Sequence, residues 1–263
     1  MGKPLLLLRL EGPLQSWGTR SRWDVRDTQP EPTKSGIIGL LGCALGYGRG
    51  DGRLEELDAG LRLGVRVEHP GRVLEDFQTI TDFLPTAAGD FKVSGGTKSA
   101  AALRADPEAR PATILSPRFY LEDAAFLAVL EAGPKDAPKL LSLCAAALHR
   151  PAWTLFLGRK ACVPTRPIFE SLTEEYAGLE DALRRHPWSH LQADLRPRQV
   201  RAEARRRVLE TFMEDPAGSL TRQDSLRLNA ARQYGFRQVR RLTPPVLLTD
   251  VYPETEVYPQ EAL

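Results

Sequence analysis

The sequence contains few cysteines and histidines, the side chains that most often bind zinc or carry redox chemistry. It has 263 residues, with only three cysteines and four histidines. The cysteines, at positions 43, 144 and 162, match no C-x-x-C spacing, and no histidine pairs with a cysteine or carboxylate at ligand spacing. We therefore expect no metal and no cofactor, and we expect the cysteines to stay reduced, as in cytoplasmic proteins.

A long hydrophobic run is also lacking. Leu5–Leu8 is apolar, but Arg9 and Glu11 interrupt the run, which is far too short to span a bilayer. The run also does not have the pattern of a secretory signal. It predicts a strand, and we expect a cytoplasmic protein that does not contact a membrane.

Motifs of the common catalytic classes are absent. No G-x-S-x-G, Walker loop or G-x-G-x-x-G joins a predicted strand to a helix. The aromatic motif of RNA-recognition domains is missing too. The sequence therefore names no catalytic residue, and any contact with RNA should use loops and helix ends.

The net charge of the chain is small, but the charged residues are unevenly distributed. The formal net charge is +2, with 42% hydrophobic and 27% charged residues, which is typical of a globular protein. Between Arg184 and Arg241, however, fourteen arginines stand against six acidic residues, a net +8, which leaves −6 for the rest of the chain. We therefore separate a basic C-terminal region, residues 161–263, from the part before it.

The most specific stretch is a glycine-rich helix predicted between Pro32 and Gly46, with no charged residue between Lys34 and Arg49. At 100° per residue its branched apolar residues fall on one side and its glycines on the other. Glycine weakens a helix by about 1 kcal/mol relative to alanine. We therefore expect both sides to be covered, one by a sheet and one by a second backbone or by nucleic acid.

The beginning of this helix predicts an anion site. Thr33 is a suitable N-cap after Pro32, and the first turn offers free N–H groups beside the Lys34 ammonium. Together these groups suit a phosphate. An ordinary capped helix with a solvated lysine is the alternative.

A long loop, Leu14–Glu31, precedes the helix. It contains Trp17 and Trp23 and the basic residues Arg20, Arg22 and Arg26. Loops of this length in compact domains are functional or disordered, and tryptophans argue against disorder.

The order of predicted elements indicates an α+β fold. Strands are expected at Pro4–Leu10, Leu61–Glu68 (half-buried), Val73–Ile80, Ile114–Leu121, Ala125–Leu130 and Trp153–Leu157, and a second helix at Asp136–His149. This order is that of a ferredoxin-like (RRM-like) βαββαβ body, residues 1–160, with a long insertion at about 81–113.

The C-terminal region is less regular. Phe169–His186 predicts an amphipathic helix, and Arg198–Asp215 fits a helix or a strand. Arg232–Arg241 interleaves Tyr234 and Phe236 with arginines, which suits stacking on bases or an edge strand whose aromatic rings face the core.

Several of these stretches carry a family resemblance. They are Leu8–Gly18, Pro32–Gly42, Asp76–Ile80, Tyr120–Phe126 and Leu157–Cys162. In this order, over about residues 4–170, the chain resembles the CasD-type subunits of type I-E CRISPR Cascade, RAMP proteins that hold the 5′ handle of the CRISPR RNA. The resemblance is looser in the C-terminal third.

The resemblance implies a non-catalytic RNA-binding protein of antiviral defence. It implies a ferredoxin-like body, a hairpin thumb after Ile80, and assembly with the backbone subunit CasC and the large subunit CasA on one CRISPR RNA, with target DNA bound only indirectly. The RNA-binding residues it implies are Gln15, Ser16, Trp17, Arg20, Arg22, Arg26, Thr33, Lys34, Ser35, Gly36, Lys92, Lys98, Arg159 and Lys160.

Two other functions compete with this one. In the type I-C relative, a metal-independent endoribonuclease that processes repeat RNA uses a tyrosine and a Lys-His pair. Tyr47 lies near the matching place, but the chain has no Lys-His dipeptide and no glycine-rich C-terminal loop. A purely protein-binding spacer is the third alternative, and it leaves the unusual helix entrance without a ligand.

Overall fold

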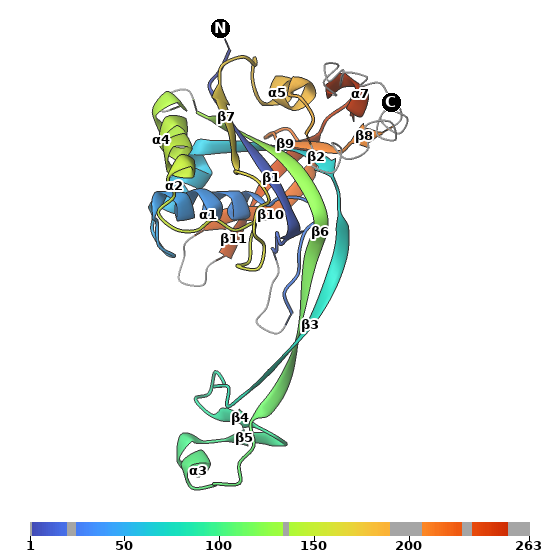
Figure 1. The fold of residues 1–263 in the computed structure, drawn as a ribbon. Helices are drawn as coiled ribbons and strands as arrows, with labels where there is room; N and C mark the ends of the chain where they lie inside the picture. The colour runs from blue at the N-terminus through green and yellow to red at the C-terminus, as the bar shows by residue number, and fades with distance from the viewer. Residues whose placement is uncertain (1, 20–24, 134–136, 190–206, 228–232, 252–263) are drawn as a thin grey trace, which may run out of the picture.

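The computed structural model describes residues 2–19, 25–133, 137–189, 207–227 and 233–251 of the chain (Figure 1). Arg20, Arg22 and Trp23, named above, lie outside the described residues, as does the first half of Arg198–Asp215. No helix in these ranges is long and apolar enough to cross a membrane.

Within these ranges an eight-stranded antiparallel sheet forms the centre of the molecule. Its order is β10-β11-β9-β2-β6-β1-β7, and β3 pairs with β6 beside this path. The strands are β1 (Leu5–Gln15), β2 (Leu61–His69), β3 (Arg72–Asp82), β6 (Ala112–Ala132), β7 (Phe169–Thr173), β9 (Thr211–Glu214), β10 (Leu220–Arg227) and β11 (Gln233–Arg241). The expectation of mixed α and β structure is confirmed.

Helices cover both faces of this sheet (Figure 1). On one face, α1 (Lys34–Leu45), α2 (Arg53–Gly60) and α4 (Ala137–His149) pack over Leu6, Leu8 and Leu10 of β1. On the other, α5 (Leu179–Arg185) and α7 (Leu248–Val251) pack near Leu5 and Leu7. Because successive side chains of a strand point to opposite faces, the continuous leucine run lies buried between the two layers, as predicted.

Strand β2 differs from its prediction. Its alternation suggested one solvated face, yet Arg66 and Glu68 are completely buried. The second face is covered by α5, and these charged side chains compensate one another there. Alternation therefore identified the strand correctly but not the burial of its polar face.

Strands β3 and β6 form a long two-stranded ribbon that projects from the body (Figure 1). The two strands predicted at 114–121 and 125–130 are one strand, β6, with Asp123 at a positive φ of 56° between its pairing with β3 and its pairing with β2. The tip, which falls in the predicted insertion, contains β4 (Phe91–Val93), β5 (Gly96–Lys98) and the short helix α3 (Ala100–Arg104).

The prediction of a strand at Trp153–Leu157 is wrong. This segment is an irregular loop: Leu157 is buried in the core that also contains α1, whereas Trp153 is 51% exposed. Just before it, Ala152 N–H donates to Ala44 O of α1 at 2.9 Å. The strand after α4 is instead β7, within the stretch that was predicted as the helix Phe169–His186. That stretch contains both β7 and α5. It was predicted as one helix because the apolar spacing was averaged over a strand and a short helix.

The C-terminal strands continue the same sheet. Strand β9 pairs with β2, and β11 and β10 follow it outward. The described part of Arg198–Asp215 is therefore extended; β8 (Val208–Leu209) also pairs there with β12 (Val246–Leu247). Strand β11 is interior, and β10 is the edge.

Candidate nucleic-acid interface

Thr33 caps helix α1 as predicted. Its backbone is extended (φ −83°, ψ 150°), and its hydroxyl accepts a hydrogen bond from Gly36 N–H at 3.2 Å. Ile37 N–H donates to the Thr33 carbonyl at 3.0 Å and begins the helical ladder. One donor of the first turn is thereby satisfied by the chain itself.

The chain's own carboxylates occupy the place predicted for a phosphate at Lys34. The lysine is only 4% exposed, and its ammonium pairs with Glu214 at 3.0 Å and Asp58 at 3.9 Å. Its N–H donates to Asp224 Oδ2 at 2.8 Å, and Arg237 holds Asp224 through two bonds of 2.7 and 2.9 Å. As folded here, Lys34 joins α1 to the C-terminal strands. A contact between Lys34 and RNA phosphate would require these ion pairs to open, and it stays a prediction.

Gln15 and Trp17 also lie inside the protein. Gln15 Nε2 donates to the carbonyls of Leu10 at 3.1 Å and Ala124 at 2.6 Å, and its Oε1 accepts from Trp17 Nε1 at 3.1 Å. Trp17 is 1% exposed. Both side chains therefore have a structural role in the fold. The contact with bases that was predicted for them stays a prediction.

Packing against other parts of the protein requires glycine at two positions of α1. A Cβ on Gly36 would lie 2.8 Å from the Trp17 ring, and one on Gly42 would lie 2.3 Å from the Leu54 side chain. A Cβ on Gly39 would meet nothing within 4 Å. The expected second covering is therefore the protein itself at Gly36 and Gly42, and the helix is open only around Gly39.

A cavity of about 380 Å³ lies over this open part of α1. It brings together residues 16–18, Arg26, α1, the 154–159 loop and β11, which are far apart in sequence. Seven residues predicted to bind RNA line it: Ser16, Trp17, Arg26, Thr33, Ser35, Gly36 and Arg159. The structure thus gathers half of the predicted residues around one opening.

Arg159 fixes the wall of this cavity. Its guanidinium donates to Phe119 O at 2.9 Å, Arg26 O at 2.8 Å and Asp27 O at 3.0 Å, and it lies 4.6 Å from the centroid of the Tyr120 ring. These bonds tie Arg26 and Asp27 to β6. Arg26 and the neighbouring Lys160 expose their own side chains to solvent.

The predicted lysines of the insertion lie elsewhere. Lys92 and Lys98 belong to β4 and β5, at the far tip of the ribbon (Figure 1). Lys98 forms an ion pair with Asp106, which offsets its charge. The structure does not bring either lysine to the cavity.

Eight lining residues are absent from the predicted set of RNA-binding residues, among them Gly39, Phe156 and Tyr234. Tyr234 was considered for base stacking, but the sequence did not place it at this site. The alternation of aromatic and basic residues around Tyr234 was a usable signal. For Phe156 no signal was available, because its segment was predicted as a strand in the sheet.

A second cavity, of about 400 Å³, lies across Thr33 from the first and is lined by acidic groups. Asp27, Glu31 and Asp224 face it together with Arg222 and Arg237. Burial raises the pKa of Glu31, and the nearby Arg222 opposes this rise. Because carboxylates repel phosphodiesters, this cavity is the poorer one for RNA.

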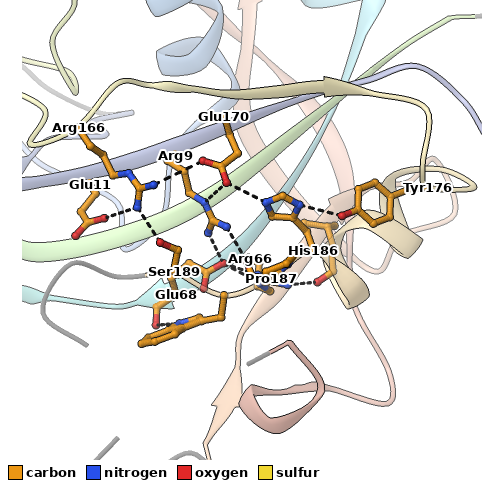
Figure 2. Close-up of polar contacts among 12 residues, drawn as sticks. Arg9, Glu11, Arg66, Glu68, Arg166, Glu170, Tyr176, His186, Pro187 and Ser189 are labelled. Atoms are coloured by element: carbon orange, nitrogen blue, oxygen red, sulfur yellow. Dashed lines mark hydrogen bonds and ion pairs between the residues drawn. The ribbon is translucent and has the colours of Figure 1, made fainter. Parts of the chain in front are cut away.

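A buried polar network lies on the opposite face of the sheet (Figure 2). Glu68 accepts from Arg66 at 2.7 Å and from Arg9 at 3.1 Å. His186 joins Glu170 at 3.2 Å to the Tyr176 hydroxyl at 3.0 Å. Although a Tyr-His-Glu chain can move protons, Tyr176 and His186 are both buried, so this network holds β1, β2, β7 and α5 together and does not meet a substrate.

Replacing Glu170 with glutamine should remove a stabilising pH dependence. The hydrogen bond from His186, with Arg9 and Arg166 nearby, lowers the pKa of Glu170 from 4.5 to about 2. A lowered carboxyl pKa stabilises the fold above pH 4.5, and this contribution disappears as the pH falls from 4.5 towards 2. At pH 7 we expect Glu170→Gln to lose about 3 kcal/mol of unfolding free energy.

Urea unfolding at several pH values between 7 and 3 would measure this loss. The difference between the wild type and Glu170→Gln should shrink as the pH falls below 4.5. The matched control is Glu174→Gln, because Glu174 is exposed. A difference that stays constant over the whole range would contradict the linkage to ionisation.

Tyr47, the residue considered for RNA cleavage, is half-buried. Arg53 lies over its ring at 3.8 Å from the centroid, and Asp51 pairs with Arg53. Within the described ranges, no group of three or more His, Cys, Asp or Glu side chains is arranged to hold a metal ion.

Comparisons with known proteins agree with the resemblance found in the sequence. A family model described as CRISPR-associated protein (Cas_Cas5) matches residues 5–240. The CRISPR system Cascade subunit CasD of Escherichia coli (strain K12) is 34% identical over 166 residues, which is 62% of this chain and 69% of that protein.

Two solved structures have the same fold over nearly the whole chain. One, described as "Crystal structure of Cas protein", has a TM-score of 0.62 and 32% identity, covering 95% of this chain and 98% of the other. A chain of a "CRISPR RNA-guided surveillance complex" has a TM-score of 0.66 and 31% identity, covering 97% and 95%. Because the family model spans most of the sequence and these structures match it throughout, the chain belongs to the CRISPR-associated Cas5 protein family.

Proposed function

We propose that this protein is a non-catalytic, CRISPR RNA-binding subunit of a Cascade surveillance complex, which holds the 5′ handle of the RNA and caps the backbone filament. Its similarity to the Cascade subunit CasD and to a chain of an RNA-guided surveillance complex supports this role. The observation that carries it is the cavity over α1, where segments from the whole length of the chain meet beside exposed basic side chains.

We further propose that the body is ferredoxin-like and that the ribbon is its thumb. The order β7-β1-β6-β2, with α1 after β1 and α4 after β6, supports the first proposal. The projecting β3–β6 ribbon, with residues 81–113 at its outer part, supports the second. The boundary proposed at residue 160 precedes the strand β7, which lies at 169–173.

In this proposal the RNA runs over the open part of α1. Arg26 and Lys160 contact phosphates, and Ser35 faces the bound nucleotide from the helix. The RNA contacts predicted for Arg20 and Arg22 lie outside the described residues. Thr33, Gly36 and Arg159 shape the site. Lys92 and Lys98 lean over the guide next to the handle, where the thumb separates the two.

The proposed partners follow from the same role. One CRISPR RNA would join this chain to the backbone subunit CasC and the large subunit CasA, and target DNA would be contacted through the RNA. The complex would act in the cytoplasm, without a membrane.

Cleavage of repeat RNA is the competing function. Tyr47 is covered by Arg53, and the Tyr176–His186 pair is buried, which favours binding without cutting. Incubating the purified protein with repeat RNA in EDTA distinguishes the two. We expect binding without cleavage; a single clean cut within the repeat would overturn the non-catalytic role.

Removing two exposed basic side chains should weaken RNA binding through electrostatics alone. Arg26→Ala with Lys160→Ala is expected to lower affinity for handle RNA about tenfold at low salt. Each lost phosphate contact should also reduce the slope of log affinity against log salt by about 0.7 for single-stranded RNA. Fluorescence anisotropy over a salt series measures both quantities.

The control for this double variant is Lys139→Ala with Arg185→Ala, which removes the same charge. These residues lie on α4 and α5, and both are exposed. The control should keep the wild-type slope. Equal slopes for all three proteins would show that the RNA does not pass Arg26 and Lys160.

A further inference from the structure

We infer that the cavity over Gly39 holds one unstacked RNA base, in contact with the rings of Tyr234 and Phe156. The inference rests on the proposed function and assigns a base site to a strand of the C-terminal region. Both residues line the cavity, Tyr234 from β11 and Phe156 from the 154–159 loop. Single-stranded RNA is recognised largely by stacking of splayed bases on aromatic side chains.

The size and lining of the cavity fit one nucleotide. Its volume of about 380 Å³ lies within the range of sites for small ligands. Arg26 and Arg159 stand at the same opening, and Ser35 and Thr154 add hydroxyl groups. No acidic side chain is among the lining residues, whereas the neighbouring cavity has three. A phosphodiester is therefore tolerated here.

Gly39 forms the open part of the cavity wall. A Cβ at this position would meet no atom within 4 Å, so the fold itself does not require glycine there. Glycine nevertheless weakens the helix relative to alanine. A flat ring that approaches the helix backbone gives a reason for its presence, unlike Gly36 and Gly42, which packing explains.

Tyr234 is held in place before any ligand binds. Its strand pairs with β10, Gln223 Nε2 donates to its carbonyl at 3.5 Å, and its half-buried ring packs against the core that contains Leu226 and Trp17. A stacking residue that is already positioned loses little conformational freedom on binding. The C-terminal region thus supplies one wall of the RNA site.

The test uses the full chain and a series of RNAs that carry the 5′ handle of the host repeat, each with one abasic nucleotide. With the wild type, one abasic position should weaken binding about 5- to 150-fold, the range for a stacked base. Tyr234→Ala should weaken binding of the intact RNA. With this variant, an abasic nucleotide at the sensitive position should cause no further loss of affinity. Phe156→Ala should act on the same position.

A second variant tests the cavity without deleting a ring. Gly39→Leu fills the open space and should weaken binding at least tenfold. Again, an abasic nucleotide at the sensitive position should cause no further loss of affinity. Gly39→Ala, which fills less of the space, should weaken binding less than Gly39→Leu does. Gly48→Leu is the matched control, because a Cβ there also meets nothing within 4 Å. Circular dichroism melts confirm that each variant is folded.

The outcomes separate this inference from the proposed function. If the wild type binds handle RNA but no abasic position is sensitive, or if Tyr234→Ala weakens all abasic RNAs equally, the base site is wrong and the function stands. If the wild type does not bind handle RNA, alone or in the assembled complex, the proposed function and the base site both fall.

Discussion

Replacing Glu68 with leucine is expected to lower the free energy of unfolding by about 3–5 kcal/mol, a large part of the stability of a typical domain. Glu68 Oε1 accepts from Arg66 Nε at 2.9 Å, Arg66 Nη2 at 2.7 Å and Arg9 Nη1 at 3.1 Å (Figure 2). All three side chains are almost completely buried. Without the carboxylate, two guanidinium groups remain inside the protein with too little compensating charge.

Urea unfolding at pH 7 measures this effect, with Glu56→Leu on the exposed side of α2 as the control. A triple variant, Arg9→Met with Arg66→Met and Glu68→Leu, should recover much of the loss, because replacing a whole buried ion network with apolar residues is often nearly neutral. A loss below 1 kcal/mol for Glu68→Leu alone would mean that water reaches these arginines.

Local patterns were sufficient to predict much of the fold. The leucine run of β1, the alternation of β2 and the spacing of α4 each reflect a single packing surface, which a short window of sequence contains. Windows that contain two elements were misread: Phe169–His186 includes both β7 and α5. In the loop at 153–157, Leu155 and Leu157 pack into the core, and apolar content alone does not distinguish such a loop from a strand.

The site was harder to predict, because distant residues decide which side chains are available. In the sequence, Lys34 looked suited to bind phosphate. The fold places Asp224 and Glu214, which follow about 190 and 180 positions later, beside it. Trp17 looked available for stacking, but the fold places its ring on Gly36. Tyr234 lines a wall opposite helix α1 only because β11 joins the sheet beyond β2.

The carboxylate of Asp224 explains why α1 does not present an open anion site. It accepts from Lys34 N–H and from Arg237, and so it occupies the position that the helix dipole and the two cations would otherwise offer to a phosphate. Asp224→Ala is expected to lower the free energy of unfolding by about 3 kcal/mol, because it leaves Arg237 and the helix start unpaired.

The same variant should acquire a response to phosphate. Millimolar phosphate is expected to raise the urea midpoint of Asp224→Ala more than that of the wild type, because an anion that binds only the folded variant stabilises it by mass action. Asp215→Ala, which removes a more exposed carboxylate paired with Arg240, is the control and should show no such gain. An equal gain in the wild type would show that the beginning of α1 accepts an anion beside Asp224, and it would support the phosphate role predicted for Lys34.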